Sequence, residues 1–332
     1  MTTRILIINV CRIGDTLLGT PLITALRAHF GPELELTCLA HPERVELLQG
    51  LPQIDHLGSI NKRSALLRGR LGGKRYDYAL VHGYDRALLR YALRVAERVI
   101  GFDQPDPQLN GRLYRAVRNP KPDGPHAVDV HTPFLAELGV PVRSRRLLYQ
   151  VSPTEADWAA TMLQPLAGRG PLIAMVVRSF PTKPFRDWPI DCFVAAAQGI
   201  QARYPQAHFI LLGGDALADA VAAFAQALPG RFTSFAGKLS LRQTAAVLAR
   251  MQLYIGVDTG PTHLAGALQV PMVALYHCLS PARAFAPLEH PALRTLQLPT
   301  PPEGCSTALS LRDIPPSAVV AAATELLACA SC

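Results

Sequence analysis

The chain lacks the features that would set it apart from ordinary globular proteins. No window approaches the roughly 20 uncharged apolar residues of a membrane-spanning helix. The N-terminus enters an apolar segment at once, with neither the hydrophobic region nor the cleavage site of a signal peptide. Only 17% of the residues are charged and 49% are hydrophobic, which indicates a well-buried globular protein. We therefore expect a cytoplasmic protein, whose 332 residues suit two domains of roughly 150 residues each.

The cysteines form no disulfide framework, and carboxylates form no D-x-D run that would bind a divalent cation. Five of the seven cysteines are scattered singly, at positions 11, 38, 192, 278 and 305. Cys329 and Cys332 form a C-x-x-C at the terminus, without a second pair or a histidine cluster nearby. We expect seven reduced thiols, with zinc or iron at the C-x-x-C as the lesser alternative, and hence no metal and no cofactor.

The net charge of +8 is compatible with nucleic acid, an anionic membrane or an acidic substrate as partner, or simply with a basic surface. Cations gather between Asn61 and Arg75, where the sequence has Lys62, Arg63, Arg68, Arg70, Lys74 and Arg75. This segment lacks the interleaved aromatic residues of a base-stacking groove. We expect it to contact phosphorylated headgroups at a membrane surface, and we expect no nucleic-acid partner.

Apolar strand-like segments alternate with amphipathic segments in both halves, which predicts an α/β fold with mostly parallel sheets. In the first half we expect a long loop at Asp103–Pro125, helices at Pro21–Phe30 and Val128–Gly139, and strands at Arg4–Val10, Leu34–Ala40, Tyr78–His82 and near Leu147–Val151. In the second half we expect strands at Pro171–Val177, His208–Leu212, Leu253–Val257 and Met272–Tyr276, and helices at Asp191–Tyr204, Ala216–Leu228, Leu241–Met251 and Ser317–Ala328. The domains would be 1–155 and 156–332, with a linker near Ser152–Gly170 and a last helix able to reach back onto the first domain.

The most informative segment is Tyr254–Tyr276, in which a polar corner joins an apolar strand to a helix of small residues. Asp258 and Thr259 can cap this helix, and Gly260 permits a tight turn. The free N–H groups of a helix N-terminus suit an anion such as a diphosphate. Many such corners bind nothing, but the density of polar groups at this one favours a binding site.

This corner resembles the ADP-heptose:lipopolysaccharide heptosyltransferases, glycosyltransferase family 9. The residues that match the family pattern D-[ST]-G-x-x-H-L-A-A-A-L-x-x-P are Asp258, Thr259, Gly260, His263, Leu264, Ala265, Ala267, Leu268 and Pro271. The opening segment RILIINVCRIGDTLLGTPLITALRAHF is similar to the family's first strand, Gly-Asp loop and first helix. More generic likeness in DYALVHGYDRALLRYALRVAERVIGF and HAVDVHTPFLAELGVP extends the resemblance over nearly the whole chain.

The resemblance implies the GT-B type of α/β fold, in which two Rossmann-like domains with mostly parallel sheets face each other across a cleft. The N-terminal domain would bind the acceptor and the C-terminal domain the nucleotide sugar. Ligands of open α/β sheets bind beyond the carboxyl ends of the strands, where both specific motifs of this chain lie.

Asp15 follows the first strand, in the sequence RIGDTL. The resemblance implies that Asp15 is the general base that deprotonates the acceptor hydroxyl. A helix cap is the alternative, although a cap alone would not favour Asp over Ser or Thr. On the acceptor side we also place Gly14, which allows close approach of the backbone, together with Thr16, Lys62 and Arg63.

Without a D-x-D, cations and backbone amides must stabilise the diphosphate leaving group. Family members usually carry K-x-W-P on the loop after the first strand of the second domain, and this chain has RDWP there. Arg186 thus takes the place of the family lysine, and Lys183 precedes it by three residues. Either can bind phosphate, Arg186 bidentately. Solvated loop cations are the alternative, which Trp188 disfavours because it would fix the loop against the domain.

Three more residues are expected on the nucleotide side. Asp215, after a Gly-Gly pair, is our choice for the ribose, although Asp is ordinary at a helix N-terminus. Ser240 lies in a sequence that resembles the family's G-x-x-[ST]-L loop beside the base, and it also suits a helix cap. His263 either donates to the sugar or phosphate or is a buried histidine bonded to a carbonyl. His82 and His126 could line the acceptor side, but we favour structural roles for both.

The expected function is an inverting, metal-independent transfer of heptose from ADP-heptose to the lipopolysaccharide inner core. The acceptor would be Kdo-lipid A or an already heptosylated core, at the cytosolic face of the bacterial inner membrane. The alternatives are a transferase using another nucleotide sugar and a nucleotide-sugar epimerase. A dinucleotide oxidoreductase is disfavoured because the first turn lacks G-x-G-x-x-G. The presence of both Asp15 and the Asp258 corner argues against a non-catalytic lipopolysaccharide-binding protein.

Overall fold

The computed structural model describes residues 2–68, 73–118, 124–214 and 217–329. They form two compact units that divide between Gln150 and Val151. The expected linker at Ser152–Gly170 is wrong, because α7 (Pro153–Leu163) occupies it and packs on α10 (Leu241–Leu248) of the second unit. The division therefore comes slightly earlier than the expected boundary after residue 155.

The first unit contains a six-stranded sheet of order β3-β2-β1-β4-β5-β6, in which all neighbours are parallel. Its strands are β1 (Thr3–Asn9), β2 (Leu34–Ala40), β3 (His56–Ser59), β4 (Tyr76–His82), β5 (Ala96–Phe102) and β6 (Arg115–Val117). The strand order reverses between β1 and β4, which creates a topological switch point at the carboxyl ends of these two strands.

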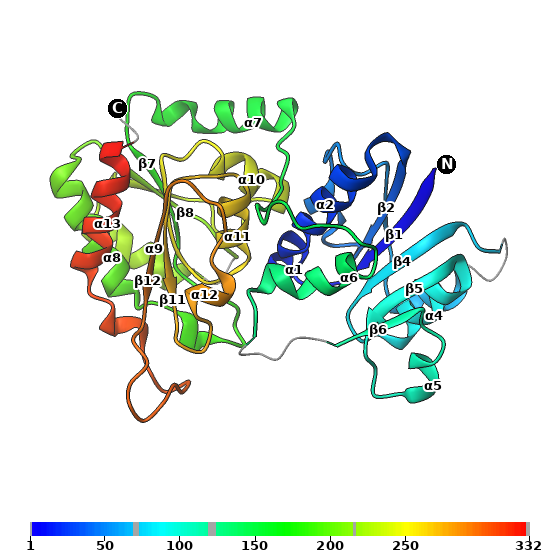
Figure 1. The fold of residues 1–332 in the computed structure, drawn as a ribbon. Helices are drawn as coiled ribbons and strands as arrows, with labels where there is room; N and C mark the ends of the chain where they lie inside the picture. The colour runs from blue at the N-terminus through cyan, green and yellow to red at the C-terminus, as the bar shows by residue number, and fades with distance from the viewer. Residues whose placement is uncertain (1, 69–72, 119–123, 215–216, 330–332) are drawn as a thin grey trace. The chain divides into compact units, whose positions relative to one another are not determined.

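Helices cover both faces of this sheet (Figure 1). Ile5 and Ile7 of β1 join the core under α2, whereas Leu6 and Ile8 join the core under α4, as the alternation of side chains along a strand requires. The helices are α1 (Ile13–Leu18), α2 (Thr20–Phe30), α3 (Lys62–Leu67), α4 (Arg86–Val95), α5 (Pro107–Asn110) and α6 (Thr132–Ala136), with 3-10 turns η1 (Gly31–Glu33), η2 (Val45–Leu48) and η3 (Ala127–His131).

The second unit repeats this architecture with the order β12-β11-β10-β7-β8-β9, again all parallel. Its strands are β7 (Leu172–Val176), β8 (His208–Leu211), β9 (Phe232–Ser234), β10 (Leu253–Val257), β11 (Met272–Tyr276) and β12 (Leu293–Gln297). Besides α7 and α10, its helices are α8 (Ile190–Arg203), α9 (Ala218–Ala227), α11 (Gly260–Ala267), α12 (Ala282–Phe285) and α13 (Pro316–Cys329), with 3-10 turns η4 (Gln164–Leu166), η5 (Pro184–Arg186) and η6 (Leu311–Asp313). The switch point lies between β7 and β10.

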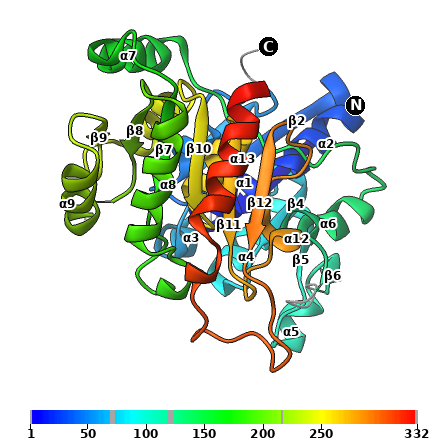
Figure 2. The ribbon, with the colours of Figure 1, turned by 90° about the vertical axis from the view of Figure 1, so that its left-hand side faces the viewer.

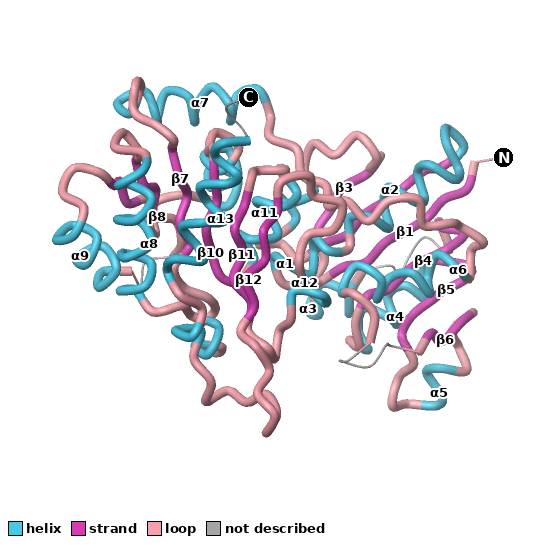
Figure 3. Tube along the Cα trace, turned by 60° about the vertical axis from the view of Figure 1, so that its left-hand side comes forward, coloured by secondary structure: helices cyan, strands magenta, loops and turns pink. Residues whose placement is uncertain are grey.

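The last helix, α13, is an integral part of the second unit. It lies beside α8 and contacts β10, β11 and β12 (Figures 2 and 3). Val319, Ala323 and Leu326 of α13 are buried in the same apolar core as the central strands. The apolar face of α13 is therefore used within its own unit, whereas we had expected that the helix could reach back onto the first domain.

Three expectations for the first unit are wrong. The segment Asp103–Pro125 is not one loop, because it contains α5 and the edge strand β6. The helix expected at Val128–Gly139 is broken into η3 and α6, and Pro133 lies in the first turn of α6, where proline is tolerated. The strand expected near Leu147–Val151 is absent, since these described residues form no ladder and the Leu148 N–H donates to the Thr20 hydroxyl at 2.9 Å.

Within the described ranges, no helix combines the length and the apolar character that a membrane crossing requires.

Candidate active site

A cavity of 600 Å³ opens at the switch point of the second unit. Its lining comes from the loops that follow β7, β8 and β10, including Arg178, Ser179, Phe180, Gly213, Gly214 and Thr259. The carboxyl ends of three neighbouring parallel strands thus converge on one space, the usual place for a ligand in an open α/β sheet. The corner between β10 and α11, singled out from the sequence, forms part of its wall.

Asp258, the first residue of this corner, is buried, with 2% of its surface exposed. Its Oδ2 lies 2.8 Å from Nη1 of Arg186, and its Oδ1 lies 3.7 Å from Nε2 of His263. Burial raises the pKa of Asp258, and the cations Arg186 and Lys183 oppose that rise. Asp258 can therefore orient two neighbouring groups, the Arg186 guanidinium and the His263 imidazole.

Of the two candidate phosphate ligands, Arg186 pairs with this carboxylate and Lys183 influences it electrostatically. Arg186 ends η5, and 16% of its side chain is exposed. Lys183, at the other end of the same turn, is half-buried and close enough to lower the pKa of Asp258. Both cations thus gather at the N-terminus of α11, where a diphosphate would find positive charge and backbone N–H groups together.

The start of α11 differs in detail from the predicted cap. Thr259 holds the N-cap position without a side-chain cap bond, and Gly260 is the first helical residue. The Thr262 hydroxyl donates to the Val257 carbonyl at 2.5 Å and lies 2.8 Å from the Tyr254 hydroxyl, which ties the helix to β10. Thr259 thus makes no cap bond through its side chain, and the Asp258 carboxylate faces Arg186 and His263.

Small residues bring α11 close to its surroundings, as its composition predicted. A Cβ at Gly266 would lie 2.3 Å from Cγ of Pro287, so this position has no room for a larger residue. His263, on the same helix, is 4% exposed and faces Asp258. The Asp258 carboxylate is thus one neighbour of this buried histidine.

The loop between β7 and α8 is fixed at several points. Trp188 is 1% exposed, donates from Nε1 to the Ile314 carbonyl at 3.1 Å and packs edge-on against Phe193. Asp187 accepts the Ser179 N–H at 2.6 Å. These contacts confirm that Trp188 anchors the loop, and they give Lys183 and Arg186 a defined position.

Arg178 is a cavity residue that the sequence did not single out. It lines the 600 Å³ cavity, pairs with Asp219 of α9 and lies 3.7 Å from Asp187. Its position could have identified Arg178 from the sequence, because it comes directly after a predicted central strand, on the loop that we expected to bind phosphate.

The predictions for two residues expected to bind the nucleotide, Asp215 and Ser240, have different outcomes. Asp215 lies outside the described residues. Ser240 is confirmed as a helix cap, since it forms a capping box with Gln243 at the start of α10. A hydrogen bond of 2.9 Å from the Gly237 N–H to the Gly213 carbonyl holds the loop before Ser240 beside the Gly-Gly pair of the cavity.

In the first unit, Asp15 follows β1 at the other switch point. It is the third residue of α1 and is exposed, whereas Arg12 holds the N-cap position, so the cap alternative for Asp15 is wrong. Burial, and then the nearby Asp15 carboxylate, raise the pKa of Cys11 to about 12. Gly14 precedes Asp15 and is half-buried. Thr16 is 1% exposed and donates to the Arg12 carbonyl at 2.9 Å, an internal contact that does not support direct binding of an acceptor.

A second cavity, of 720 Å³, opens in the first unit at the ends of β1 and β4. Lys62 and Arg63, both exposed, stand on its rim, so two of the predicted acceptor ligands share one space. Lys62 pairs with Asp85 at 3.1 Å, while the other oxygen of Asp85 caps α4. Arg70 of the same basic segment lies outside the described residues.

His82 forms part of the wall of this cavity. Its ring stacks on that of His131 with centroids 4.1 Å apart, and burial lowers the pKa of both, that of His131 to about 4. His126 caps η3 by accepting the Val128 N–H at 3.2 Å. His126 is thus structural, as favoured from sequence, whereas His82 combines burial with a place at the cavity.

Comparisons with known proteins extend the resemblance beyond the motifs. Residues 65–303, more than two thirds of the chain, match the model of glycosyltransferase family 9 (heptosyltransferase). Lipopolysaccharide heptosyltransferase 3 of Escherichia coli is 24% identical over 282 residues, covering 79% of this chain and 80% of that protein. The solved glycosyl transferase family 9 protein of Veillonella parvula aligns with a TM-score of 0.83 at 20% identity, covering 98% of this chain and 97% of that one. The solved ADP-heptose lps heptosyltransferase II of E. coli aligns with a TM-score of 0.78 at 23% identity, covering 99% and 100%.

The structural likeness runs through both units and confirms the predicted α/β fold of GT-B type, with its two parallel six-stranded sheets. The match to the family model confirms the resemblance inferred from the two end motifs. The chain belongs to glycosyltransferase family 9, the heptosyltransferases.

Proposed function

We propose that the chain transfers heptose from ADP-heptose to the inner core of lipopolysaccharide, with inversion at the anomeric carbon and without a metal ion in the transfer step. The observation that carries this proposal is the corner between β10 and α11. There the buried Asp258 holds Arg186, with Lys183 nearby, beside a cavity of 600 Å³. Cations and helix N–H groups at one point suit the charge that develops on a diphosphate leaving group.

ADP-heptose is the donor that fits best with the relatives. The solved E. coli heptosyltransferase II is named for ADP-heptose, and the E. coli curated relative is named for lipopolysaccharide. The walls of the cavity include Phe180, of which 41% is exposed, next to the Gly-Gly loop, and this combination suits a flat base and a ribose. Asp215, proposed for the ribose, belongs to the same loop.

The proposed chemistry draws on both units. The acceptor hydroxyl attacks the anomeric carbon from the face opposite ADP, Asp15 takes its proton, and the bond from that carbon to the β-phosphate oxygen breaks. Arg186, Lys183 and the Gly260 N–H at the start of α11 stabilise the departing ADP. Asp15 suits the role of base because it is exposed and is not used as a helix cap.

The acceptor is proposed to bind at the first unit, on the rim formed by Lys62 and Arg63. The same helix exposes Leu66 and Leu67, with 51% and 70% of their surfaces accessible. Cations next to exposed leucines suit an anionic headgroup region, where the charges pair with phosphates and the apolar side chains enter the interface. We therefore propose peripheral contact with the anionic cytosolic surface of the inner membrane.

Thermal unfolding in the presence of ADP, UDP, GDP and NAD tests the donor class. Ligands that bind the native state raise the unfolding midpoint, so ADP should raise it and the other three should do so less. A larger shift with UDP or GDP would move the proposal to another nucleotide sugar, and a shift with UDP alone would favour an epimerase of similar fold. Analysis of the product formed from ADP-heptose and a Kdo-lipid A acceptor then tests the transfer itself.

A further inference from the structure

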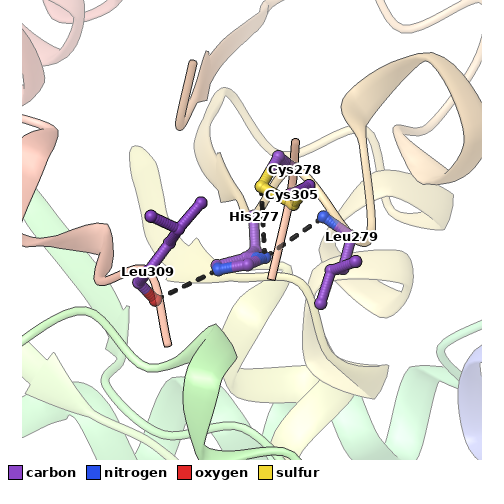
Figure 4. Close-up of a disulfide and its surroundings, with 5 residues drawn as sticks. All are labelled: His277, Cys278, Leu279, Cys305 and Leu309. Carbon is purple, nitrogen blue, oxygen red and sulfur yellow. Dashed lines mark hydrogen bonds between the residues drawn. A yellow bond between two sulfur atoms is a disulfide. The ribbon is translucent and has the colours of Figure 1, made fainter. Parts of the chain in front are cut away.

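Three side chains that can bind metal ions gather at the end of β11. His277 and Cys278 follow the strand directly, and Cys305 comes from the loop after β12, 27 residues further along the chain than Cys278. One ligand atom from each lies within 4.8 Å of the others (Figure 4). The two sulfur atoms are bonded as a disulfide, which corrects the expectation of seven reduced thiols. Cys11, Cys38, Cys192 and Cys329 carry free thiols.

The imidazole of His277 is oriented as a metal ligand would be. The residue is fully buried, and its Nε2 donates to the Leu309 carbonyl at 3.2 Å. This bond leaves the lone pair on Nδ1, which lies 3.8 Å from Sγ of Cys278 (Figure 4). In metal sites the second ring nitrogen of a histidine ligand commonly donates to a backbone carbonyl in this way. The Leu279 N–H donates to Nδ1 at 3.1 Å, so a cation bound at Nδ1 would displace this hydrogen bond.

The distance from Nδ1 to Sγ of Cys278 is close to that of a tetrahedral site, and the two sulfur atoms, which are bonded to each other here, must move apart when the disulfide is reduced. Zinc binds thiolate at about 2.3 Å and imidazole nitrogen at about 2.0–2.1 Å, which places the two ligand atoms about 3.6 Å apart. The observed distance from Nδ1 to Sγ is 3.8 Å. Two thiolates and one imidazole are also a ligand set that favours zinc over hard cations such as magnesium.

We propose that His277, Cys278 and Cys305 form a redox-gated site for one thiophilic divalent cation, such as Zn²⁺, with water in the fourth position. The sequence had led us to expect a chain without a metal site, so this proposal revises that expectation.

In the reduced state both thiols release their protons to solvent and bind the cation as thiolates. A small-molecule disulfide oxidises the site: the two thiolates give up two electrons, the bond between Cys278 and Cys305 forms, the S–S bond of the oxidant breaks, its two sulfurs take up two protons from solvent to become thiols, and the cation leaves. A dithiol reductant reverses the step: it gives up two electrons and two protons, becomes a disulfide itself, and both cysteine thiols re-form.

The proposed metal site adjoins the corner between β10 and α11, where we propose that the diphosphate binds, without being part of it. The ring of Phe185 packs edge-on against His277 with centroids 5.0 Å apart, and Arg186 follows Phe185 in the chain. A cation here would therefore support the loop that carries Arg186 and would not touch the reacting atoms.

Cobalt titration of the 332-residue chain tests the proposal. The background variant Cys329→Ser/Cys332→Ser removes the terminal C-x-x-C, and the protein is treated with a phosphine reductant and freed of metal by chelation. We expect one Co²⁺ per chain, with the absorption of a thiolate-bound cobalt, displacement by Zn²⁺, and no binding after oxidation with a small-molecule disulfide. Adding Cys305→Ser should weaken binding by more than about 100-fold, beyond the 10–100-fold typical of outer-shell groups, and adding His277→Gln by at least about 10-fold.

The partly buried Cys305 makes the safer variant, because its loop position tolerates serine better than the core position of His277. Unchanged thermal unfolding of the Cys305→Ser protein, measured without metal under reducing conditions, shows that the fold is kept. The proposal is overturned if the reduced background variant binds no thiolate-coordinated cobalt, if it unfolds on reduction, or if Cys305→Ser binds cobalt as tightly as the background variant.

Discussion

At the scale of single residues, a buried carboxylate organises the corner between β10 and α11, where we propose that the diphosphate binds. Asp258 holds the guanidinium of Arg186 at 2.8 Å and faces the His263 ring. A charge buried to this extent is tolerated only when it is paired, so the ion pair and the position of Arg186 depend on each other. We propose that Asp258 acts on a bound diphosphate through its neighbours and is a positioning residue.

Removal of the Arg186 side chain should weaken ADP binding more than removal of Lys183. Arg186→Ala is expected to cost about 1.5–3 kcal/mol of binding free energy, as for hydrogen bonds to a charged group, and Lys183→Ala less. Isothermal titration calorimetry measures both. Arg203→Ala, on the far end of α8 where Arg203 bonds Thr324, is the matched control and should leave ADP binding unchanged. The opposite order of Arg186 and Lys183 would show that Lys183, not Arg186, fills the place of the family lysine.

The pairing of Asp258 should also appear in the pH dependence of stability. Burial raises the pKa of Asp258 above its ordinary value of 3.8, and Arg186 opposes the rise, so Arg186→Gln should raise this pKa further. A carboxyl whose pKa is raised by folding favours the folded state when protonated, and this contribution is lost as pH increases through the folded pKa. The variant should therefore lose about 3–5 kcal/mol near pH 8 and much less near pH 4.

Urea unfolding of both proteins at several pH values measures this difference. The double variant Arg186→Gln/Asp258→Asn, which has no carboxylate at this position, should lose the pH dependence. A destabilisation by Arg186→Gln that is equal at pH 4 and pH 8 would contradict the pairing.

At the scale of elements, local patterns decided which helices and strands could be predicted. Strands β10 and β11 match their predicted bounds, because continuous apolar runs mark strands buried on both faces. Strand β2 also matches its predicted bounds, although Glu35 and Thr37 interrupt its apolar residues. Strand β5 was not predicted, since exposed Glu97 and Arg98 interrupt its apolar run. Helix α7 was taken for a linker although Ser152 and Glu155 form a capping box, which was the available signal.

In the candidate site, too, some features could be predicted from the sequence and others could not. The loops after β7 and β10 and the cations on them were predictable, because motif residues mark them in sequence. The internal contacts of Asp258 and Thr16 were not, since side-chain partners depend on which elements a fold brings together. Likewise, Cys278 and Cys305 are far apart in sequence, and only the pairing of β11 with β12 brings their loops together.

Helix α7 should depend on one ion pair for its attachment to α10. Glu155 binds Arg242 through both carboxylate oxygens at 2.6 Å and also accepts the Ser152 N–H. Arg242 lowers the pKa of Glu155 to about 2, so this contribution to stability is present above the ordinary pKa of 4.5 and is lost as pH falls toward 2. Glu155→Gln should cost about 1.5–3 kcal/mol at pH 7 and little near pH 2.

Glu325→Gln is the control for this prediction, because the pair of Glu325 with Arg294 is largely exposed and solvent screens such pairs, so they contribute little to stability. Denaturant unfolding at pH 7 and at low pH compares the two variants. Equal effects of both substitutions at pH 7 would mean that the Glu155 pair does not anchor α7.

Helix α3 and its flanks carry the proposed contact with anionic membranes. Replacing Lys62, Arg63, Arg68 and Arg70 with Gln should lower binding to anionic vesicles, because each cation near such a surface contributes about 1 kcal/mol, and salt screens the attraction. ADP affinity should not change. Vesicle sedimentation at low and high salt makes the measurement, and equal binding by variant and wild type would show that the basic segment is merely solvated.

For the whole molecule, the two units repeat one strand order, and each has its switch point at a predicted motif. In the first unit the motif supplies Asp15, and in the second it supplies the Asp258 corner. Membership in glycosyltransferase family 9 gives this arrangement its chemical meaning. The proposed reaction requires a base from the first unit and a leaving-group site from the second. A variant that loses one of these two functions should therefore keep the other.

The most direct test of this account is the rate of heptose transfer by Asp15→Asn, measured with ADP-heptose and a Kdo-lipid A acceptor alongside the ADP dissociation constant. Asn keeps the size of the side chain but cannot take a proton. The account predicts turnover reduced by roughly 10²–10⁴, the usual contribution of a general base, with ADP affinity and thermal stability near those of the wild type. Normal turnover by Asp15→Asn would remove Asp15 from the mechanism and contradict the account.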